Sequence, residues 1–258
     1  MAGPRKSFLI AQVSDIHCGD PRFDDGLMQA VIEKVNEADP DLLIVGGDLT
    51  VAGYRDEYEA ARGYLDRFAC PQRMVIAGNH DQRNVGYLIF EEMFGPRWSS
   101  ATFSHRAQLG GKVEEFIKVV SVDSNKPDLE DGEVGRQNYN RIRQEFCEEG
   151  FFKVFVLHHH LIHVPGTGRE RNIVSDAGDV LETLLSCGVH MSLSGHKHVP
   201  YVWVLQGLHV VTSGTAGTHR TRGYTPPSFN LIEVFRDRVK VSFVFPEIGQ
   251  EQENILLF

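Results

Sequence analysis

FLIAQVSDIH, residues 8–17, shows a pattern that recurs along the chain. Its first six residues are mostly apolar and predict a buried β-strand over 8–13. The strand stops at Ser14 and Asp15, and His17 follows two residues later. Four further apolar runs also end in polar side chains, mostly beside glycine: LLIVGGD (42–48), MVIAGNHD (74–81), KVFVLHHH (153–160) and MSLSGHKH (191–198). These five stretches decide both the fold and the candidate site.

Predicted helices separate the first three of these strands. Apolar residues recur at helical spacing over residues 27–38, and residues 54–68 also have a helical pattern. The strands between and after them are expected at 42–45 and 74–77. A strand–helix–strand–helix–strand order predicts a parallel sheet with right-handed crossovers.

The rest of the chain continues as layered α/β structure. Two strands are expected within residues 99–122 around a Gly110–Gly111 turn, followed by an acidic loop at 123–136. Helices are predicted at 137–148 and 180–187, and strands at 153–157, 191–193, 201–205, 208–212, 229–235 and 239–245. No repeat or long linker interrupts the sequence, so we expect a single α/β domain over residues 1–258.

Composition narrows the function classes. The chain has 258 residues, and 26 basic against 35 acidic side chains give a net charge of −9. This charge disfavours a general nucleic-acid binder and a membrane-surface protein, because both need basic patches. No apolar run reaches the 18 residues of a membrane span. The four cysteines form no C-x-x-C pair and are expected to be reduced, so we predict a cytoplasmic protein.

The polar residues at the strand ends predict a metal site. In open α/β sheets, ligands bind outside the carboxyl ends of the strands. The residues collected there are Asp15, His17, Asp48, Asn79, His80, His158, His196 and His198. Imidazole and carboxylate suit one or two transition-metal cations. In extended backbone, positions i and i+2 point to the same side, so Asp15 with His17 and His196 with His198 are each expected to converge.

Each motif alone also has a simpler interpretation. D-x-H is typical of a cap or a surface pair, G-G-D and G-N-H-D are typical of turns, and H-H-H suits a solvated loop. The occurrence of all five in order, each at the end of its own predicted strand, favours the metal site.

The series D-x-H, G-D, G-N-H-D, H and G-H-x-H resembles the calcineurin-like metallophosphoesterase superfamily over residues 8–245. Within it, the chain looks like the compact class III cyclic-nucleotide phosphodiesterases and glycerophosphodiesterases. The resemblance implies a four-layer α/β-β/α sandwich of two mixed sheets flanked by helices. It also implies two divalent or trivalent metal ions (Mn, Fe or Zn). By motif, Asp15, His17 and His198 hold one ion, Asn79, His158 and His196 hold the other, and Asp48 bridges them.

Two departures limit this transfer. The family histidine is commonly followed by P-P or P-L, whereas here the run is His158-His159-His160-Leu161, so His159 is an alternative ligand to His158. The second motif, Gly47-Asp48-Leu49-Thr50, lacks the longer form of the protein phosphatases, which weakens a phosphoprotein substrate.

The resemblance implies hydrolysis of a phosphodiester of the cyclic-nucleotide or glycerophosphodiester type, and the constellation suits attack by a metal-bridging hydroxide. Asp48 and His80 are the expected catalytic residues: Asp48 bridges the ions, and His80 faces the substrate as general acid or charge stabiliser. The alternatives are a phosphomonoesterase, a nuclease or a non-catalytic metal-binding scaffold. The expected partner is a small phosphoester, with no membrane and no nucleic-acid polymer. A homodimer follows from the resemblance alone.

Overall fold

The computed structural model describes residues 7–104, 115–168 and 173–257, and within these ranges two six-stranded sheets face each other. The first sheet has the order β12-β11-β10-β1-β2-β3 and the second β4-β5-β6-β7-β9-β8. The strands of the first sheet are β1 (Phe8–Val13), β2 (Leu42–Val45), β3 (Arg73–Val75), β10 (Phe229–Val234), β11 (Arg238–Phe245) and β12 (Gln250–Leu257). Those of the second are β4 (Ser99–Ser104), β5 (Glu115–Ser121), β6 (Phe152–Val156), β7 (Met191–Ser194), β8 (Tyr201–Leu205) and β9 (Leu208–Thr212).

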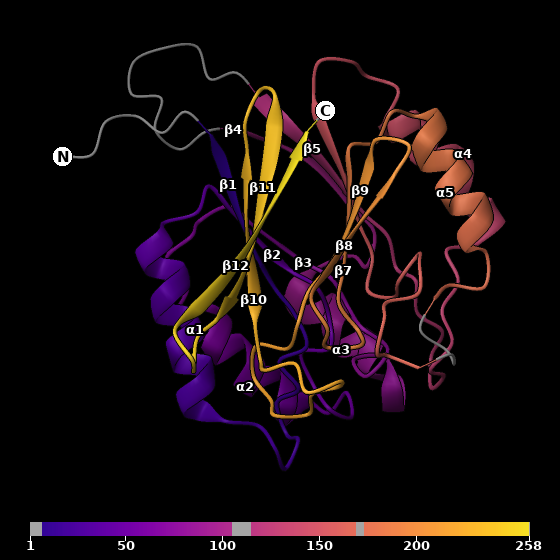
Figure 1. Cartoon of the computed structure of the whole chain (residues 1–258). Coiled ribbons are helices and arrows are strands. Elements are labelled where there is room, and N and C mark those ends of the chain that lie inside the picture. The colour runs from indigo at the N-terminus through magenta and orange to yellow at the C-terminus, as the bar shows by residue number, and fades with distance from the viewer. Residues whose placement is uncertain (1–6, 105–114, 169–172, 258) are drawn as a thin grey trace.

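Helices cover the outer face of each sheet, and this gives the four-layer sandwich that the sequence predicts. In Figure 1, α1 and α2 flank the sheet of β1 and β10, and α4 and α5 flank the sheet of β7 and β9. The helices are α1 (Asp25–Ala38), α2 (Arg55–Leu65), α3 (Gly86–Phe94), α4 (Arg136–Glu145) and α5 (Ala177–Ser186), with a 3₁₀ turn at Arg83–Val85.

Three apolar clusters correspond to the three interfaces between layers. One lies between the first sheet and α1 to α3 and includes Val31 and Tyr58. The second fills the space between the sheets and includes Ile10 and Val154, and the third packs α4 and α5 on the second sheet. Helix α1 shows how the sequence produces this packing: its buried residues lie on one face, and the Asp24 carboxylate caps it by accepting from the Leu27 N–H at 2.9 Å.

Both sheets are mixed: the parallel strands of the first sheet form one half of it, with β3 at the edge, and those of the second sheet lie at its centre. β1 pairs with β2 and β2 with β3 in parallel, as the alternating pattern predicts, and β5, β6, β7 and β9 also run parallel. Parallel neighbours end at the same edge of a sheet, so the loops after β1, β2, β3, β6 and β7 gather at one end of the molecule.

Some element predictions need correction. The helix expected at 54–68 ends at Leu65, and the strand expected at 74–77 spans Arg73–Val75. Two elements were missed: α3 lay within an unassigned stretch, and β12 is mostly polar and exposed, so it lacks a strand's apolar alternation. The Gly110–Gly111 turn lies outside the described residues. None of the helices in the described ranges has the length and apolarity that crossing a membrane requires. That residues 1–258 form a single domain stays a prediction.

Buried amide side chains link the two sheets next to the site. Gln12 of β1 donates from Nε2 to the Ser194 carbonyl of β7 at 3.0 Å. Asn230 of β10 donates from Nδ2 to the Gln12 Oε1 at 2.9 Å and to the Thr212 carbonyl of β9 at 3.0 Å. These contacts fix the register in which the loops of the two sheets meet.

Replacing Gln12 with leucine tests this link. Gln12→Leu removes a hydrogen bond from the Ser194 carbonyl and one from Asn230 Nδ2, and an unsatisfied buried polar group costs about 1–3 kcal/mol. We expect the Tm to fall by about 2–4 °C for each kcal/mol lost, measured by calorimetry. Gln252→Leu on the exposed strand β12 is the control and should change the Tm little. Equal Tm values for Gln12→Leu and the wild type would contradict a structural role for the amide link.

Candidate metal centre

The eight candidate residues come from five loops and meet in one buried cluster. Asp15 and His17 follow β1, Asp48 follows β2, Asn79 and His80 follow β3, His158 follows β6, and His196 and His198 follow β7. All eight are buried. The side chains form three overlapping groups, and within each group one nitrogen or oxygen atom per residue lies within 4.8 Å of the others. The groups are Asp15, His17 and His198; His17, Asp48 and His80; and Asp48, His158 and His196. The predicted set is therefore assembled in space.

Convergence does not come from extended backbone, contrary to our expectation. Asp15 (φ 56°), His17 (φ 55°), Asp48 (φ 52°), His196 (φ 80°) and His198 (φ 59°) all have left-handed conformations. Non-glycine residues adopt this region rarely and at a cost, and such residues cluster at functional sites. The sharp turns, not a two-residue strand period, direct these side chains into one cluster.

Glycine allows the two sheets to approach closely at this point. A Cβ atom at Gly195 would lie 2.0 Å from Ser14 Oγ and 2.5 Å from Asp15 Oδ2. The space that it leaves lets both Asp15 carboxylate oxygens accept from the His196 N–H at 3.0 Å. Asp15 thus connects the loop after β1 in the first sheet to the loop after β7 in the second.

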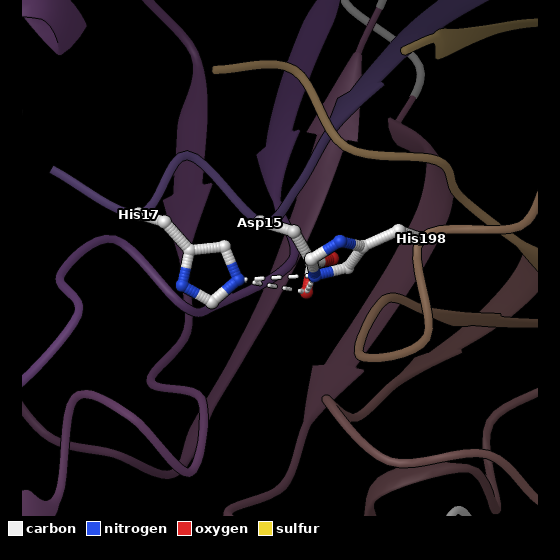
Figure 2. Close-up of side chains that lie close together, drawn as sticks. All are labelled: Asp15, His17 and His198. Atoms are coloured by element: carbon white, nitrogen blue, oxygen red, sulfur yellow. Dashed lines mark hydrogen bonds and ion pairs between the residues drawn. The ribbon is translucent and has the colours of Figure 1, made fainter. Parts of the chain in front are cut away.

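At one side of the centre, Asp15 lies between two histidines (Figure 2). Its Oδ1 is 3.2 Å from His198 Nε2 and 3.9 Å from His17 Nε2. The two Nε2 atoms are themselves 3.0 Å apart. His198 directs Nε2 inward because its Nδ1 contacts the Arg220 carbonyl, which only accepts, so Nδ1 carries the proton.

At the other side, Asp48 lies beside His158. Asp48 Oδ2 is 3.4 Å from His158 Nε2 and 3.7 Å from His17 Nε2. The Asp48 carboxylate therefore lies between the histidine on the Asp15 side of the cluster and the histidine on the Asn79 side. Asn79 Oδ1 is 3.2 Å from His158 Nε2 and 3.0 Å from His196 Nδ1. His158 Nδ1 donates to the Gly46 carbonyl at 2.8 Å, which again leaves Nε2 facing the centre.

The geometry separates His158 from His159. Both ring nitrogens of His159 are used within the protein: Nδ1 is 3.0 Å from Ser124 Oγ and Nε2 is 3.1 Å from the Glu130 carbonyl. His159 therefore offers no nitrogen to the cluster, whereas His158 offers Nε2.

Charges in the cluster are strongly coupled. Burial acts to raise the pKa of Asp48, but the charges of His158, His80 and His17 hold it well below its usual value. For Asp15, burial likewise opposes the His198 charge and hydrogen bond, and the pKa is lowered. Burial acts to lower the pKa of His158, yet the Asp48 charge and hydrogen bond raise it to about 9. Burial lowers the pKa of His17 to about 3 and that of His196 well below its usual value. Two buried carboxylates and mainly neutral imidazoles result.

This donor set fits metal cations. Neutral imidazole nitrogens and ionised carboxylates are the forms that bind metals. Facing nitrogens such as His17 Nε2 and His198 Nε2 hold at most one proton between them, so a cation satisfies the cluster better than hydrogen bonds do. Among the described residues, the buried Asn79 Nδ2 and His17 Nδ1 have no hydrogen-bond partner.

His80 has a different position from the other imidazoles. Its Nδ1 contacts the Val51 carbonyl at 2.7 Å, and its N–H donates to Asp48 Oδ1 at 2.9 Å. Its ring packs edge-on against His17 with centroids 4.8 Å apart. Because the carbonyl holds the proton on Nδ1, Nε2 is the ring atom left for a ligand. His80 also belongs to one of the three metal-competent groups, so a ligand role is the alternative to a substrate role.

The cluster opens into a narrow cleft that is partly open to solvent. Besides members of the donor set, the cleft is lined by Glu130, Lys197, Arg220 and Arg222. Burial lowers the pKa of Lys197, and the charge of Arg222 lowers it further, so the two cations lie within electrostatic range. Sequence reasoning did not single out these four residues, because no pattern separates them from surface charges.

The carboxylate of Asp81 joins two loops beside the site. Oδ2 accepts from the N–H groups of Gly78 at 2.8 Å and Leu49 at 3.1 Å, and Oδ1 accepts from Thr50 N at 2.9 Å and Oγ1 at 2.8 Å. Burial and nearby Asp48 raise the pKa of Asp81 to about 7. Asp81 thus positions the loops that carry Asp48, Asn79 and His80.

Comparison with known proteins identifies the family. The chain belongs to the calcineurin-like phosphoesterase family, whose model matches residues 8–200. A protein of Synechococcus sp. named probable cyclic nucleotide phosphodiesterase is 26% identical over 211 residues, which are 78% of this chain and 77% of that protein.

Solved structures share the fold at low identity. A dimetal phosphatase from Danio rerio superposes with a TM-score of 0.69 at 13% identity, over 97% of this chain and 99% of the other. A structure described as GAP50, the anchor in the inner membrane complex of Plasmodium, gives 0.74 at 12% identity, over 98% and 90%. Both support the sandwich architecture.

Asp81→Asn tests the loop connection. Asparagine has the same shape as aspartate, but its amide N–H₂ group would face two of the four donors and break their hydrogen bonds. We expect the free energy of unfolding, measured by chemical denaturation, to fall by about 1–3 kcal/mol. The metal content after loading with Mn²⁺ should fall with it, measured by elemental analysis. Asp237→Asn, in the exposed turn between β10 and β11, is the control, with a change within about 0.5 kcal/mol. Wild-type stability and metal content in Asp81→Asn would exclude the positioning role.

Proposed function

We propose that this chain is a dinuclear metal-dependent phosphodiesterase that hydrolyses small diesters of the cyclic-nucleotide or glycerophosphodiester type. The observation that carries the proposal is the position of His80: it lines the cleft beside a donor set of two carboxylates, an amide and imidazoles. The named function of the Synechococcus relative supports a diester over a monoester.

In this proposal the residues divide into two metal sites. Asp15, His17 and His198 would hold one cation, Asn79, His158 and His196 the other, and Asp48 would bridge them. Bound Mn, Fe or Zn would supply Lewis-acid activation of the phosphoryl group and of a water molecule.

The chain's own residues then orient the substrate and move the proton. The Val51 carbonyl keeps a proton on His80 Nδ1, so that a second proton on Nε2 makes the ring a cation that can donate to the departing ester oxygen. The Asp48 carboxylate accepts the His80 N–H and so fixes the backbone from which this ring projects. The net charge of −9 favours a small phosphoester over a nucleic-acid polymer. A cytoplasmic location and a homodimer remain predictions.

Substrate preference is the first test. Protein stripped of metal and reloaded with Mn²⁺, Fe²⁺ or Zn²⁺ should hydrolyse bis(p-nitrophenyl) phosphate with a higher kcat/KM than p-nitrophenyl phosphate, and the stripped protein should be inactive. A preference for the monoester would assign a phosphomonoesterase instead. Two bound ions without activity on either compound would favour a non-catalytic scaffold and contradict the proposal.

His80→Ala tests the proposed acid. General acid catalysis contributes about 10²–10⁴-fold, so we expect kcat on the diester to fall by that factor while the protein keeps both metal ions. Metal analysis distinguishes the roles, because loss of one equivalent would make His80 a ligand. Turnover at the wild-type rate would remove His80 from the mechanism.

A further inference from the structure

The cleft carries more positive charge than the rest of the molecule leads one to expect. The whole chain has a net charge of −9, yet Lys197, Arg220 and Arg222 all line the opening above the donor set. Glu130 is the acidic side chain at this rim, and its Oε1 is already paired with Arg83 Nη2 at 2.5 Å. The charge of Glu130 also acts on Lys197, but three cations stand against one acidic side chain at this rim, so positive charge is in excess.

Lys197 is the most informative of these cations. Its residue is only 6% exposed, and its ammonium makes no hydrogen bond or ion pair within the described part of the chain. A lysine ammonium at the mouth of a cleft with no direct partner is free to pair with an anion. Lys197 lies between the left-handed residues His196 and His198, and it lines the cleft.

Arg222 is available in the same way, whereas Arg220 is partly committed. Arg222 is exposed and has no ion pair with a residue in the described ranges. The Arg220 carbonyl accepts from His198 Nδ1, and its guanidinium lies 4.0 Å from Asp20 Oδ2. Lys197 and Arg222 are thus the pair of cations left to meet a ligand.

A scissile phosphate does not need this pair. Its charge would be met by the cations of the donor set and by His80, as argued above. Lysine as a point charge and arginine as a planar fork together suit a further phosphate group.

We propose that Lys197 and Arg222 form a second anion subsite, and that the substrate is a phosphodiester whose alcohol portion carries a further phosphate. This inference rests on the proposed function and adds the class of substrate to it.

A matched pair of chromogenic diesters tests the subsite: thymidine 5′-(p-nitrophenyl phosphate) with and without a 3′-phosphate. With the metal-loaded full chain at low salt, we expect the 3′-phosphate to lower KM about tenfold, as hydrogen bonds to charged groups predict. The advantage should shrink at high salt, because exposed charges are screened.

Variants connect the advantage to the two residues. Lys197→Met and Arg222→Gln should each lower kcat/KM for both compounds unequally. The factor lost should be at least about five times greater for the 3′-phosphorylated compound than for the compound without the 3′-phosphate. Arg236→Gln is the control with the same change in net charge. It follows β10, whose last residue Val234 pairs with Phe8 at the start of β1, so it lies at the end of the sheet away from the site. It should keep the wild-type discrimination. The exposed Arg222 keeps the test valid should Lys197→Met fold poorly.

Binding provides a readout that does not need turnover. Calorimetric titration with thymidine 3′,5′-bisphosphate and thymidine 5′-phosphate should give tighter binding of the bisphosphate, with the difference lost in both variants. Equal affinities of the two ligands for the wild type would overturn the subsite. If each variant lost the same factor of affinity for the bisphosphate and for the monophosphate, the subsite would also be overturned, because Lys197 and Arg222 would then contact the scissile phosphate. A bisphosphate preference without hydrolysis of bis(p-nitrophenyl) phosphate would leave the subsite standing and remove only the phosphodiesterase.

Discussion

The structure depends most on the burial of two carboxylates, Asp15 and Asp48, in one cluster at the end of the sheets. Buried charges require opposite charge and hydrogen bonds nearby. Backbone N–H groups of His196 and His80 donate to them, and His158 and His198 lie within ion-pair distance. The imidazoles, the sharp turns and the glycines beside them can all be understood as the means of compensating these two anions.

Compensation of this kind needs both sheets. The carboxylates and Asn79 come from the loops of the first sheet, and His158, His196 and His198 from those of the second. The buried amides of Gln12 and Asn230 join the sheets just behind these loops. The centre therefore exists only when the two halves of the sandwich are docked, and a ligand that bridges the halves stabilises the folded state by mass action.

The sequence predicts the parallel strands and the cluster because both depend on local patterns. Apolar runs that end near Asp15, Asp48 and Asn79 indicate both a strand and the polar side chains that follow its carboxyl end. The backbone at Asp15 with His17 and at His196 with His198 was predicted wrongly as extended, because left-handed turns at aspartate and histidine leave no composition signal. β12 was missed for a related reason: its pairing with β11 is a tertiary effect on a polar segment.

The loop contacts of Asp81 and His159 show where sequence reasoning ends. Both residues lie inside motifs that resemble ligand sets, yet both make their hydrogen bonds within the protein. Asp81 accepts from four donors, and His159 contacts Ser124 and the Glu130 carbonyl. Which histidine of H-H-H directs a ring nitrogen to the centre depends on which carbonyl the other nitrogen contacts. For His158 it is Gly46 of the neighbouring sheet, a partner 112 positions away in the sequence. Such pairings decide the chemistry of the site, and they are set by the docking of the sheets.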